Sequence, residues 1–218
     1  ITWIPMQNGK VYTGDLYIKK VENPNYQYPM GTDGVYATIT AAIADLNLRG
    51  VTGPTRFLLN DASYTTGETY PLVINIGNIS LPTATNTVTI KPNTGVNASI
   101  TGDAPASRIF TILNNYVTID GSNTANGTTR NLTITNSSVT TPQVLVIGST
   151  GTTPITNVTV KNCNLVNGVT TSSAVIVSDG ALPGTAGWFN NITIQNNSIK
   201  QAYIGLYTIA NIATGNGS

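Results

Sequence analysis

The sequence predicts an all-β fold, a right-handed parallel β-helix (solenoid), with one short N-terminal capping α-helix. Three observations lead to this prediction. Thr and Asn supply more than a quarter of the residues, a four-residue strand motif recurs, and apolar and polar residues alternate within each copy. Because one such repeat cannot bury its apolar face alone, we expect successive copies to stack.

The charge balance bears on possible partners. Charged residues make up 9% of the chain, the net charge is +1, and the ten Lys and Arg residues are spread thinly. A nucleic-acid binder concentrates such residues on one face, so no nucleic-acid partner is expected. Disorder pairs low hydrophobicity with high net charge, whereas 40% of these residues are hydrophobic, so we expect a folded chain. No run approaches the ~18 apolar residues of a membrane span.

Two regions are expected along the chain. Residues 1–34, which include the Tyr-rich stretch Lys10–Ile18, predict an irregular β segment or the end of a preceding domain. Residues 35–218 predict the β-helix. No signal segment precedes Ile1, and residues 214–218 have loop composition, so we expect an excised or processed start and a truncated C-terminal end of the solenoid.

One helix is predicted at residues 38–50. Thr38 is expected as its N-cap, Arg49 suits the negative C-terminal end, and Gly50 suits the stop. The apolar residues recur at i, i+3, i+4 and i+7, namely Ile39, Ala42, Ile43 and Leu46. We interpret this helix as a lid, because an open solenoid end exposes apolar core and unpaired strand edges.

A short strand motif recurs from residue 87 onward. Its copies are Thr87-Val-Thr-Ile90, Tyr116-Val-Thr-Ile119, Asn131-Leu-Thr-Ile134, Asn157-Val-Thr-Val160 and Asn191-Ile-Thr-Ile194. The last three copies are each followed by a second strand, at 143–147, 174–177 and 203–207. Thr118 and Thr133 are too close in sequence for a full turn. We therefore expect the 116–119 strand to lie on a different face from the other copies.

Alternation within the motif assigns side-chain directions. The aliphatic residues are expected inside, at positions 132, 134, 158, 160, 192 and 194. Thr133, Thr159 and Thr193 are expected to point outward and to stack in one column, about 4.8 Å apart. Asn136, Asn162 and Asn196 are expected to share one position at the bend after the strand, because Asn tolerates left-handed geometry and its amides hydrogen-bond along the axis.

At these motifs the sequence resembles the pectin-lyase-like superfamily of parallel β-helices. More closely, it is similar to the long secreted β-helix surface proteins of gliding and marine Bacteroidota. The resemblance covers roughly residues 36–218 and rests on segments 36–54, 57–64, 117–121 and 191–198. It implies a bacterial protein, extracellular or on the cell surface, exported in full-length relatives with a C-terminal sorting domain. One such fold hosts many activities, so the resemblance is specific for fold alone.

Catalytic chemistry finds little support in the sequence. The chain has no histidine, which excludes His-based acid–base catalysis, Ser-His-Asp triads and most zinc sites. None of the nine carboxylates recurs at a matching position in successive repeats. We therefore assign no catalytic residue and no metal ligand. A calcium-assisted lyase stays open through Asp103, Asp120 and Arg108, with calcium as the only cofactor considered.

The remaining unusual side chains have structural interpretations. Asp120-Gly121 predicts a turn after a strand, Cys163 a small core or ladder position, and Arg130 and Lys161 a solvated surface. Exposed aromatic residues would bind sugars, and the candidates are Trp188 and Tyr203 near the variable loop 179–190. An ice-binding face would need Thr-x-Thr on several repeats, and the equivalents of Thr133-Ile-Thr135 do not supply it.

The favoured hypothesis is a non-catalytic extracellular structural or adhesive β-helix. Such a protein would be an adhesin, a stalk, or a filament or surface-layer component that acts through self-association or contact with other surface proteins. The alternative is a carbohydrate-active β-helix, either a polysaccharide lyase or a glycan-binding module. Whether the protein is an enzyme stays open at this point, although the sequence favours a protein that is not an enzyme.

Overall fold

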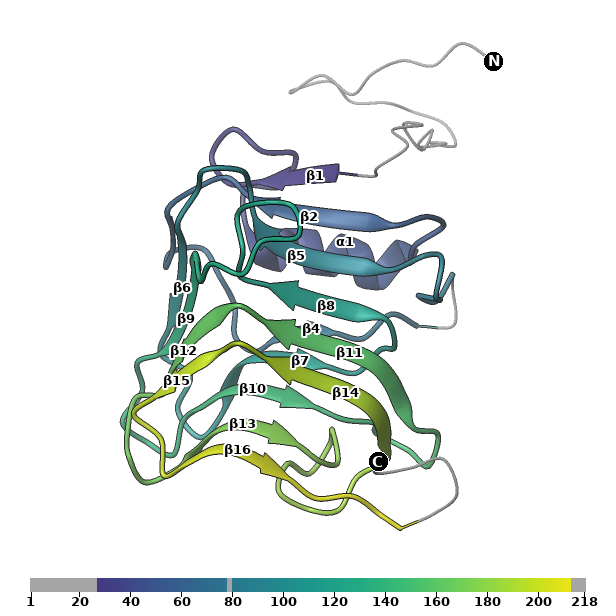
Figure 1. Cartoon of the computed structure of the whole chain (residues 1–218), viewed down its shortest axis with the longest axis vertical. Helices are drawn as coiled ribbons and strands as arrows, with labels where there is room; N and C mark the ends of the chain where they lie inside the picture. Colours follow the sequence, from purple (N-terminus) through teal and green to yellow (C-terminus); the bar gives the residue numbers. More distant parts are fainter. Residues whose placement is uncertain (1–26, 78–79, 213–218) are drawn as a thin grey trace.

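A computed structural model describes residues 27–77 and 80–212, and these coil into three parallel sheets (Figure 1). Sheet A contains β1 (Gln27–Met30), β2 (Thr55–Leu59), β5 (Val88–Pro92), β8 (Val117–Asp120), β11 (Ile155–Lys161) and β14 (Phe189–Gln195). Sheet B contains β3 (Ser63–Tyr64), β6 (Ala98–Gly102), β9 (Leu132–Asn136), β12 (Cys163–Val166) and β15 (Ser198–Lys200). Sheet C contains β4 (Leu72–Ile74), β7 (Arg108–Ile112), β10 (Gln143–Ile147), β13 (Ser173–Val177) and β16 (Ile204–Thr208).

The chain visits the sheets in the order A, B, C, and we call each such set of three strands a rung. Every strand pairs in parallel with its equivalent in the neighbouring rung. In Figure 1, sheet A strands run leftward in front and sheet C strands run rightward behind, while the chain descends from β1 to β16. The coil is therefore right-handed, which confirms the predicted parallel β-helix.

The core is a column of aliphatic side chains inside the coil. Of the six predicted inward positions, Leu132, Ile134, Val158 and Val160 are fully buried. Ile192 and Ile194 belong to the last rung and are partly buried against the same core. Alternation with period two therefore placed the inner side chains correctly in both sheets A and B.

The helix, α1 (Ile39–Arg49), forms where it was predicted. Thr38 accepts a hydrogen bond from Ala41 N, and Gly50 stops the helix at φ 67°. The buried side chains are the predicted ones, Ile39, Ala42, Ile43 and Leu46. The Glu68 carboxylate adds a second cap, because it accepts bonds from the backbone N–H groups of Ile39 (2.8 Å) and Thr40 (2.7 Å) at the positive end of the helix.

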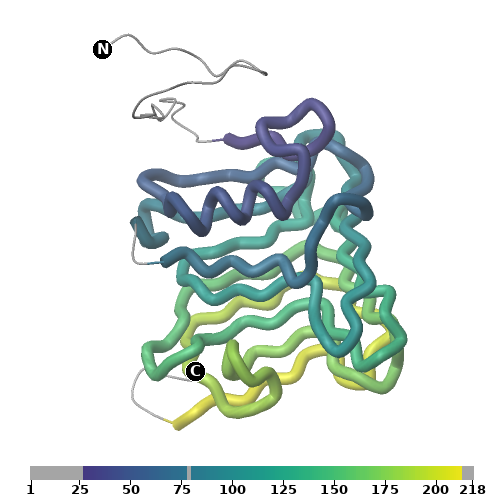
Figure 2. Tube along the Cα trace, turned by 180° about the vertical axis from the view of Figure 1, so that it is seen from behind, coloured from purple at the N-terminus to yellow at the C-terminus, as the bar shows by residue number. Residues whose placement is uncertain are grey.

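The helix covers the N-terminal edge of sheet C, as Figure 2 shows from behind. β4 is the terminal strand of that sheet, and the Asn47 carboxamide pairs with its free backbone groups. Asn47 Nδ2 donates to Val73 O (2.7 Å), and Asn47 Oδ1 accepts from Asn75 N (2.9 Å). A side chain thus takes the place of a neighbouring strand, which agrees with the lid interpretation for this edge.

The described part of the predicted N-terminal segment belongs to the solenoid. β1 pairs in parallel with β2, with Gln27 opposite Arg56, so sheet A begins before residue 35. The expected strand at residues 10–18 lies outside the described residues. None of the helices within the described ranges is long and apolar enough to cross a membrane.

The strand register corrects part of the predicted alignment. The second strands are equivalent as expected, since β10, β13 and β16 pair in sheet C. The 131–134 copy, however, lies in sheet B, where Thr133 pairs with Ser99 and Asn164. The 116–119 copy lies in sheet A, where Thr118 pairs with Thr159. The two copies therefore occupy different faces, as predicted. The predicted Thr column was wrong in one member, because Thr118 stacks with Thr159 and Thr193 in sheet A, whereas Thr133 lies in sheet B.

Candidate functional site on the outer face of sheet A

The corner where sheet A leads into sheet B carries an extended network of polar side chains. It is built around the 121–131 loop, which joins β8 to β9. Beside it run the last residues of the sheet A strands, where Lys91, Asp120, Lys161 and Gln195 stand in register on neighbouring strands. Alternate residues in those strands are buried, so these four side chains emerge on the outer face.

A ladder of side-chain hydrogen bonds follows this corner along the axis. Asn196 Nδ2 donates to Asn162 Oδ1 (2.8 Å), and Asn162 Nδ2 donates to Asp120 Oδ1 (2.7 Å). Asn162 and Asn196 have positive φ values, 58° and 51°, as the sequence predicted for a bend. Asp120 also accepts from Ser122 N (3.0 Å), so the predicted turn exists and its carboxylate ends the ladder.

Asn136 does not belong to this ladder. It ends β9 in sheet B, one corner further along the chain, and it is fully buried there. Its amide donates to Ala104 O, Ser107 O and Gln143 O and accepts from Ala104 N and Ser138 N. The predicted set therefore divides into a corner ladder (Asn162, Asn196) and a separate buried hub (Asn136), because the 131–134 copy lies in sheet B.

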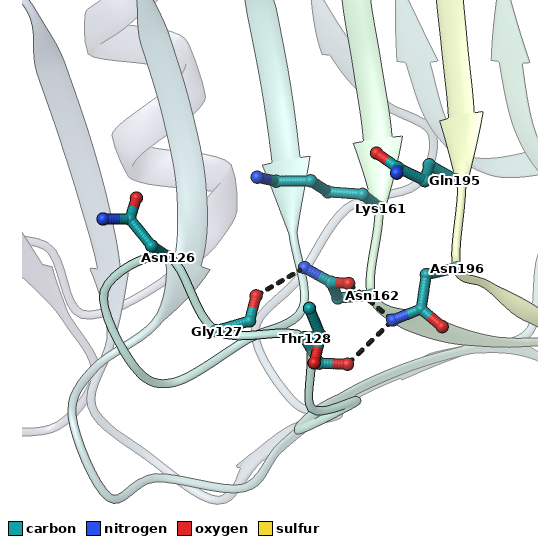
Figure 3. A pocket seen from close by; sticks show the side chains of 7 residues that line it. All are labelled: Asn126, Gly127, Thr128, Lys161, Asn162, Gln195 and Asn196. Atoms are coloured by element: carbon teal, nitrogen blue, oxygen red, sulfur yellow. Dashed lines mark hydrogen bonds between the residues drawn. The ribbon is translucent and has the colours of Figure 1, made fainter.

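The 121–131 loop crosses several rungs. Toward the N-terminal side, Asn123 Nδ2 donates to Val96 O (3.0 Å) and Lys91 Nζ donates to Thr124 O (3.1 Å). Toward the C-terminal side, Asn162 Nδ2 donates to Gly127 O (3.2 Å) and Asn196 Nδ2 to Thr128 O (2.7 Å), as Figure 3 shows. The loop thus joins the rung of β5 to the rung of β14.

Arg130 completes this bridge. Its Nε donates to Asn196 O and its Nη2 to Asn196 Oδ1, both at 2.8 Å, although 66 residues separate the two positions. Arg130 is exposed, as the sequence predicted, and it also fixes the loop to a rung two turns further along the chain.

A groove lies between the loop and the outer face of sheet A. Its floor comes from β2, β5, β8 and β11, and its wall from the loop residues Asn123, Ala125 and Asn126. Three cations line it: Arg56, Lys91 and Lys161. The rest of the lining mixes polar and apolar residues. Gln27, Thr89, Asn93, Thr94 and Thr118 are polar and uncharged, whereas Leu58, Pro92 and Ala125 are apolar. A second hollow on the far side of the loop shares Asn126 and Lys161 with it (Figure 3).

Charge is unevenly distributed within the groove. Asp120 is its sole carboxylate among the described lining residues, and it is 7% exposed and 3.4 Å from Lys161 Nζ. Burial lowers the pKa of Lys91. The nearby carboxylate of Asp120 raises this pKa, whereas the positive charges of Arg56 and Lys161 lower it further. Arg56 is exposed, and its side chain makes no hydrogen bond or ion pair within the described part of the chain. The free positive charge therefore lies at Arg56 and Lys91.

The residues considered for a calcium-assisted site do not come together. Asp120 ends β8 in sheet A, whereas Arg108 begins β7 in sheet C and donates from Nε to Thr111 Oγ1. Asp103 follows β6 of sheet B. Within the described ranges no three His, Cys, Asp or Glu side chains form a group that could hold a metal ion.

Trp188 and Tyr203 lie at different corners of the last rung. Trp188 precedes β14 in sheet A, and its carbonyl accepts from Ile155 N. Tyr203, 75% exposed, precedes β16 in sheet C, and its N–H bonds Ser172 O. The fold does not gather them into one sugar-stacking surface, and any binding role remains a prediction for each residue separately.

Cys163 occupies the core position that the sequence assigned to it. The side chain is fully buried, and its Sγ donates to Lys161 O (3.1 Å). Burial raises the pKa of the Cys163 thiol to about 12, with a smaller contribution from Asp120. The thiol therefore stays protonated at neutral pH and is a poor nucleophile.

Two features of the site went unrecognised in the sequence. The first is the cation cluster, whose members are 35 and 70 residues apart and look scattered until the strands stack. The second is an amide pair at the start of the motif, where Asn191 Nδ2 donates to Asn157 Oδ1 and both residues have positive φ. The repeated Asn before each Val-Thr or Ile-Thr unit was a signal that could have revealed this second pair.

No protein-family model, no curated protein and no solved structure matches this chain. The functional argument therefore proceeds from the geometry of the fold and of this groove.

Proposed function

We propose that this chain is a non-catalytic structural or adhesive β-helix of a bacterial surface, belonging to the secreted, pectin-lyase-like type. It acts as a stiff segment of an adhesin, filament or surface layer, through contact with copies of itself or with other surface proteins. The single observation that supports this proposal most is the loop that joins four rungs along one corner. An ordinary solenoid rung contacts its neighbours alone.

Stiffness follows from how the rungs are joined. Each rung pairs with the next in all three sheets, so bending the axis stretches backbone hydrogen bonds on one side. The Asp120–Asn162–Asn196 ladder adds side-chain bonds between adjacent rungs. The 121–131 loop adds bonds between rungs that are not adjacent, through the contacts of Arg130 and Thr128 with Asn196. A domain whose parts are cross-linked in this way resists deformation, which suits a load-bearing role better than a mobile active site.

A turnover assay tests the non-catalytic part of the proposal. The chain is incubated with acidic and neutral polysaccharides, with and without added calcium, and chain length is followed by viscosity and by new reducing ends. We expect no depolymerisation under either condition. Calcium-dependent cleavage would replace the structural proposal with the lyase alternative.

Self-association is tested by sedimentation over a range of protein concentrations. We expect the degree of association to rise with concentration. A wild-type chain that stays monomeric at all concentrations would contradict this part of the proposal.

A second candidate function is glycan binding, and the groove on sheet A favours it. Its lining combines cations with hydroxyl and carboxamide groups, which are the partners that sugar hydroxyls and acidic substituents need. Binding without cleavage is compatible with an adhesive role, because an adhesin must recognise a surface.

A further inference from the structure

The free cations of the groove are spaced for one extended anionic ligand. Arg56 lies opposite Thr89, and Lys91 lies two residues beyond Thr89 on β5, so Arg56 and Lys91 stand on adjacent strands. Lys161 is two rungs from Lys91, about 10 Å along the axis, with Asp120 between them. Because Asp120 already compensates Lys161, uncompensated charge remains at the Arg56–Lys91 end.

The groove also limits what kind of anion can approach. Lys91 is held by its bond to Thr124 O, so the loop positions its ammonium beneath the wall instead of leaving it in bulk solvent. Arg56 offers a planar guanidinium that can bind two oxygens of one oxyanion side by side. Thr89, Thr118 and Gln27 surround the pair with neutral donors and acceptors.

We propose that Arg56 and Lys91 form an oxyanion subsite that binds a carboxylate or sulfate group carried by an acidic polysaccharide. This inference rests on the glycan-binding candidate and names the substituent and the residues that recognise it. The neutral hydroxyl and amide lining favours a polysaccharide over an acidic peptide, since sugar rings present hydroxyls next to each charge whereas a poly-acidic peptide presents chiefly carboxylates and amides. Asn123 and Asn126 of the loop contact the sugar ring that carries the oxyanion.

Calorimetric titration at one fixed ionic strength tests the subsite. The ligands are dextran sulfate, its uncharged parent dextran, alginate as a carboxylate polymer, and poly-glutamate as an acidic peptide. The proteins are the wild type, the double variant Arg56→Gln/Lys91→Gln, and the control Lys200→Gln, whose change lies on β15 of sheet B. Circular dichroism melting confirms that all three proteins are folded to the same extent.

We expect dextran sulfate, alginate or both to bind and dextran to bind at least about tenfold more weakly. The double variant should lose about tenfold or more in affinity, because charge-assisted hydrogen bonds typically contribute that much, while Lys200→Gln stays near wild type. The preferred polymer identifies sulfate or carboxylate as the natural substituent.

Three results would overturn the inference, and they separate it from the function on which it rests. If an acidic polymer binds but the double variant equals wild type, or Lys200→Gln loses as much, the subsite is wrong while glycan binding stands. If none of the polysaccharides binds, the glycan-binding candidate itself fails. If poly-glutamate binds more tightly than the polysaccharides, the groove recognises acidic peptides instead.

Discussion

Replacing the buried amide of Asn136 tests how far polar hubs, and not only the aliphatic column, stabilise this coil. In Asn136→Ala the backbone keeps its conformation, since Asn136 has no left-handed φ. The side chain, however, is fully buried and bonds the backbone at 2.8–3.2 Å on both sides of the corner. The variant therefore removes hydrogen bonds without adding backbone strain.

The magnitude follows from the groups left behind. Ala104 N and Ser138 N both donate to Asn136 Oδ1, and each loses that acceptor in the variant. A buried donor left without a partner costs about 1–3 kcal/mol, so for two donors we expect a loss of about 2–6 kcal/mol in the free energy of unfolding. Domains are stable by only about 5–15 kcal/mol, so this loss is large.

Urea titration followed by circular dichroism measures the change, with the slope of the transition compared between variants. Asn131→Ala is the matched control. Its amide makes an exposed bond to Asn97 and accepts only a long bond, 3.4 Å, from Asn123 N, so it should contribute less than about 1 kcal/mol. The reasoning that this amide stabilises the corner would be refuted if Asn136→Ala lowered the free energy of unfolding by less than about 1 kcal/mol, or by no more than Asn131→Ala does.

Three further predictions concern the rung contacts, the buried thiol and the helix. A Cβ on Gly121 would lie 1.8 Å from Asn162 O, so Gly121→Ala should shift the pairing of β8 with β11. The free energy of unfolding, measured with heat or urea, should fall by about 3 kcal/mol or more. The control Gly151→Ala has open space around the new Cβ and should be near neutral. Burial raises the pKa of Cys163 to about 12, whereas an unfolded thiol titrates near 8.5, so between these pH values the folded state holds a proton that the unfolded state releases. The free energy of unfolding should therefore fall as pH rises from about 8.5 to 12. Urea titrations at each pH measure this slope, which Cys163→Ala should flatten. Asn47→Ala should leave the β4 edge unpaired and cost about 1–2 kcal/mol, while the neighbouring exposed Leu48→Ala stays within about 0.5 kcal/mol in the same assay.

Local pattern alone determined much of the fold. The helix at 39–49, its cap at Thr38 and its stop at Gly50 follow from spacing and side-chain chemistry within a dozen residues. The direction of each strand residue follows from alternation, as Val158 and Val160 show. The left-handed bends at Asn162 and Asn196 follow from the tolerance of Asn for that conformation.

Only the tertiary structure decided which side of the coil each strand occupies. The 131–134 and 157–160 copies are nearly identical strands, yet one lies in sheet B and the other in sheet A. A four-residue motif encodes strand formation but carries no information about how much loop precedes it, and loop length sets the face. For the same reason Arg56, Lys91 and Lys161 meet in one groove that their separation in sequence conceals, because stacking, not sequence distance, sets which side chains are neighbours.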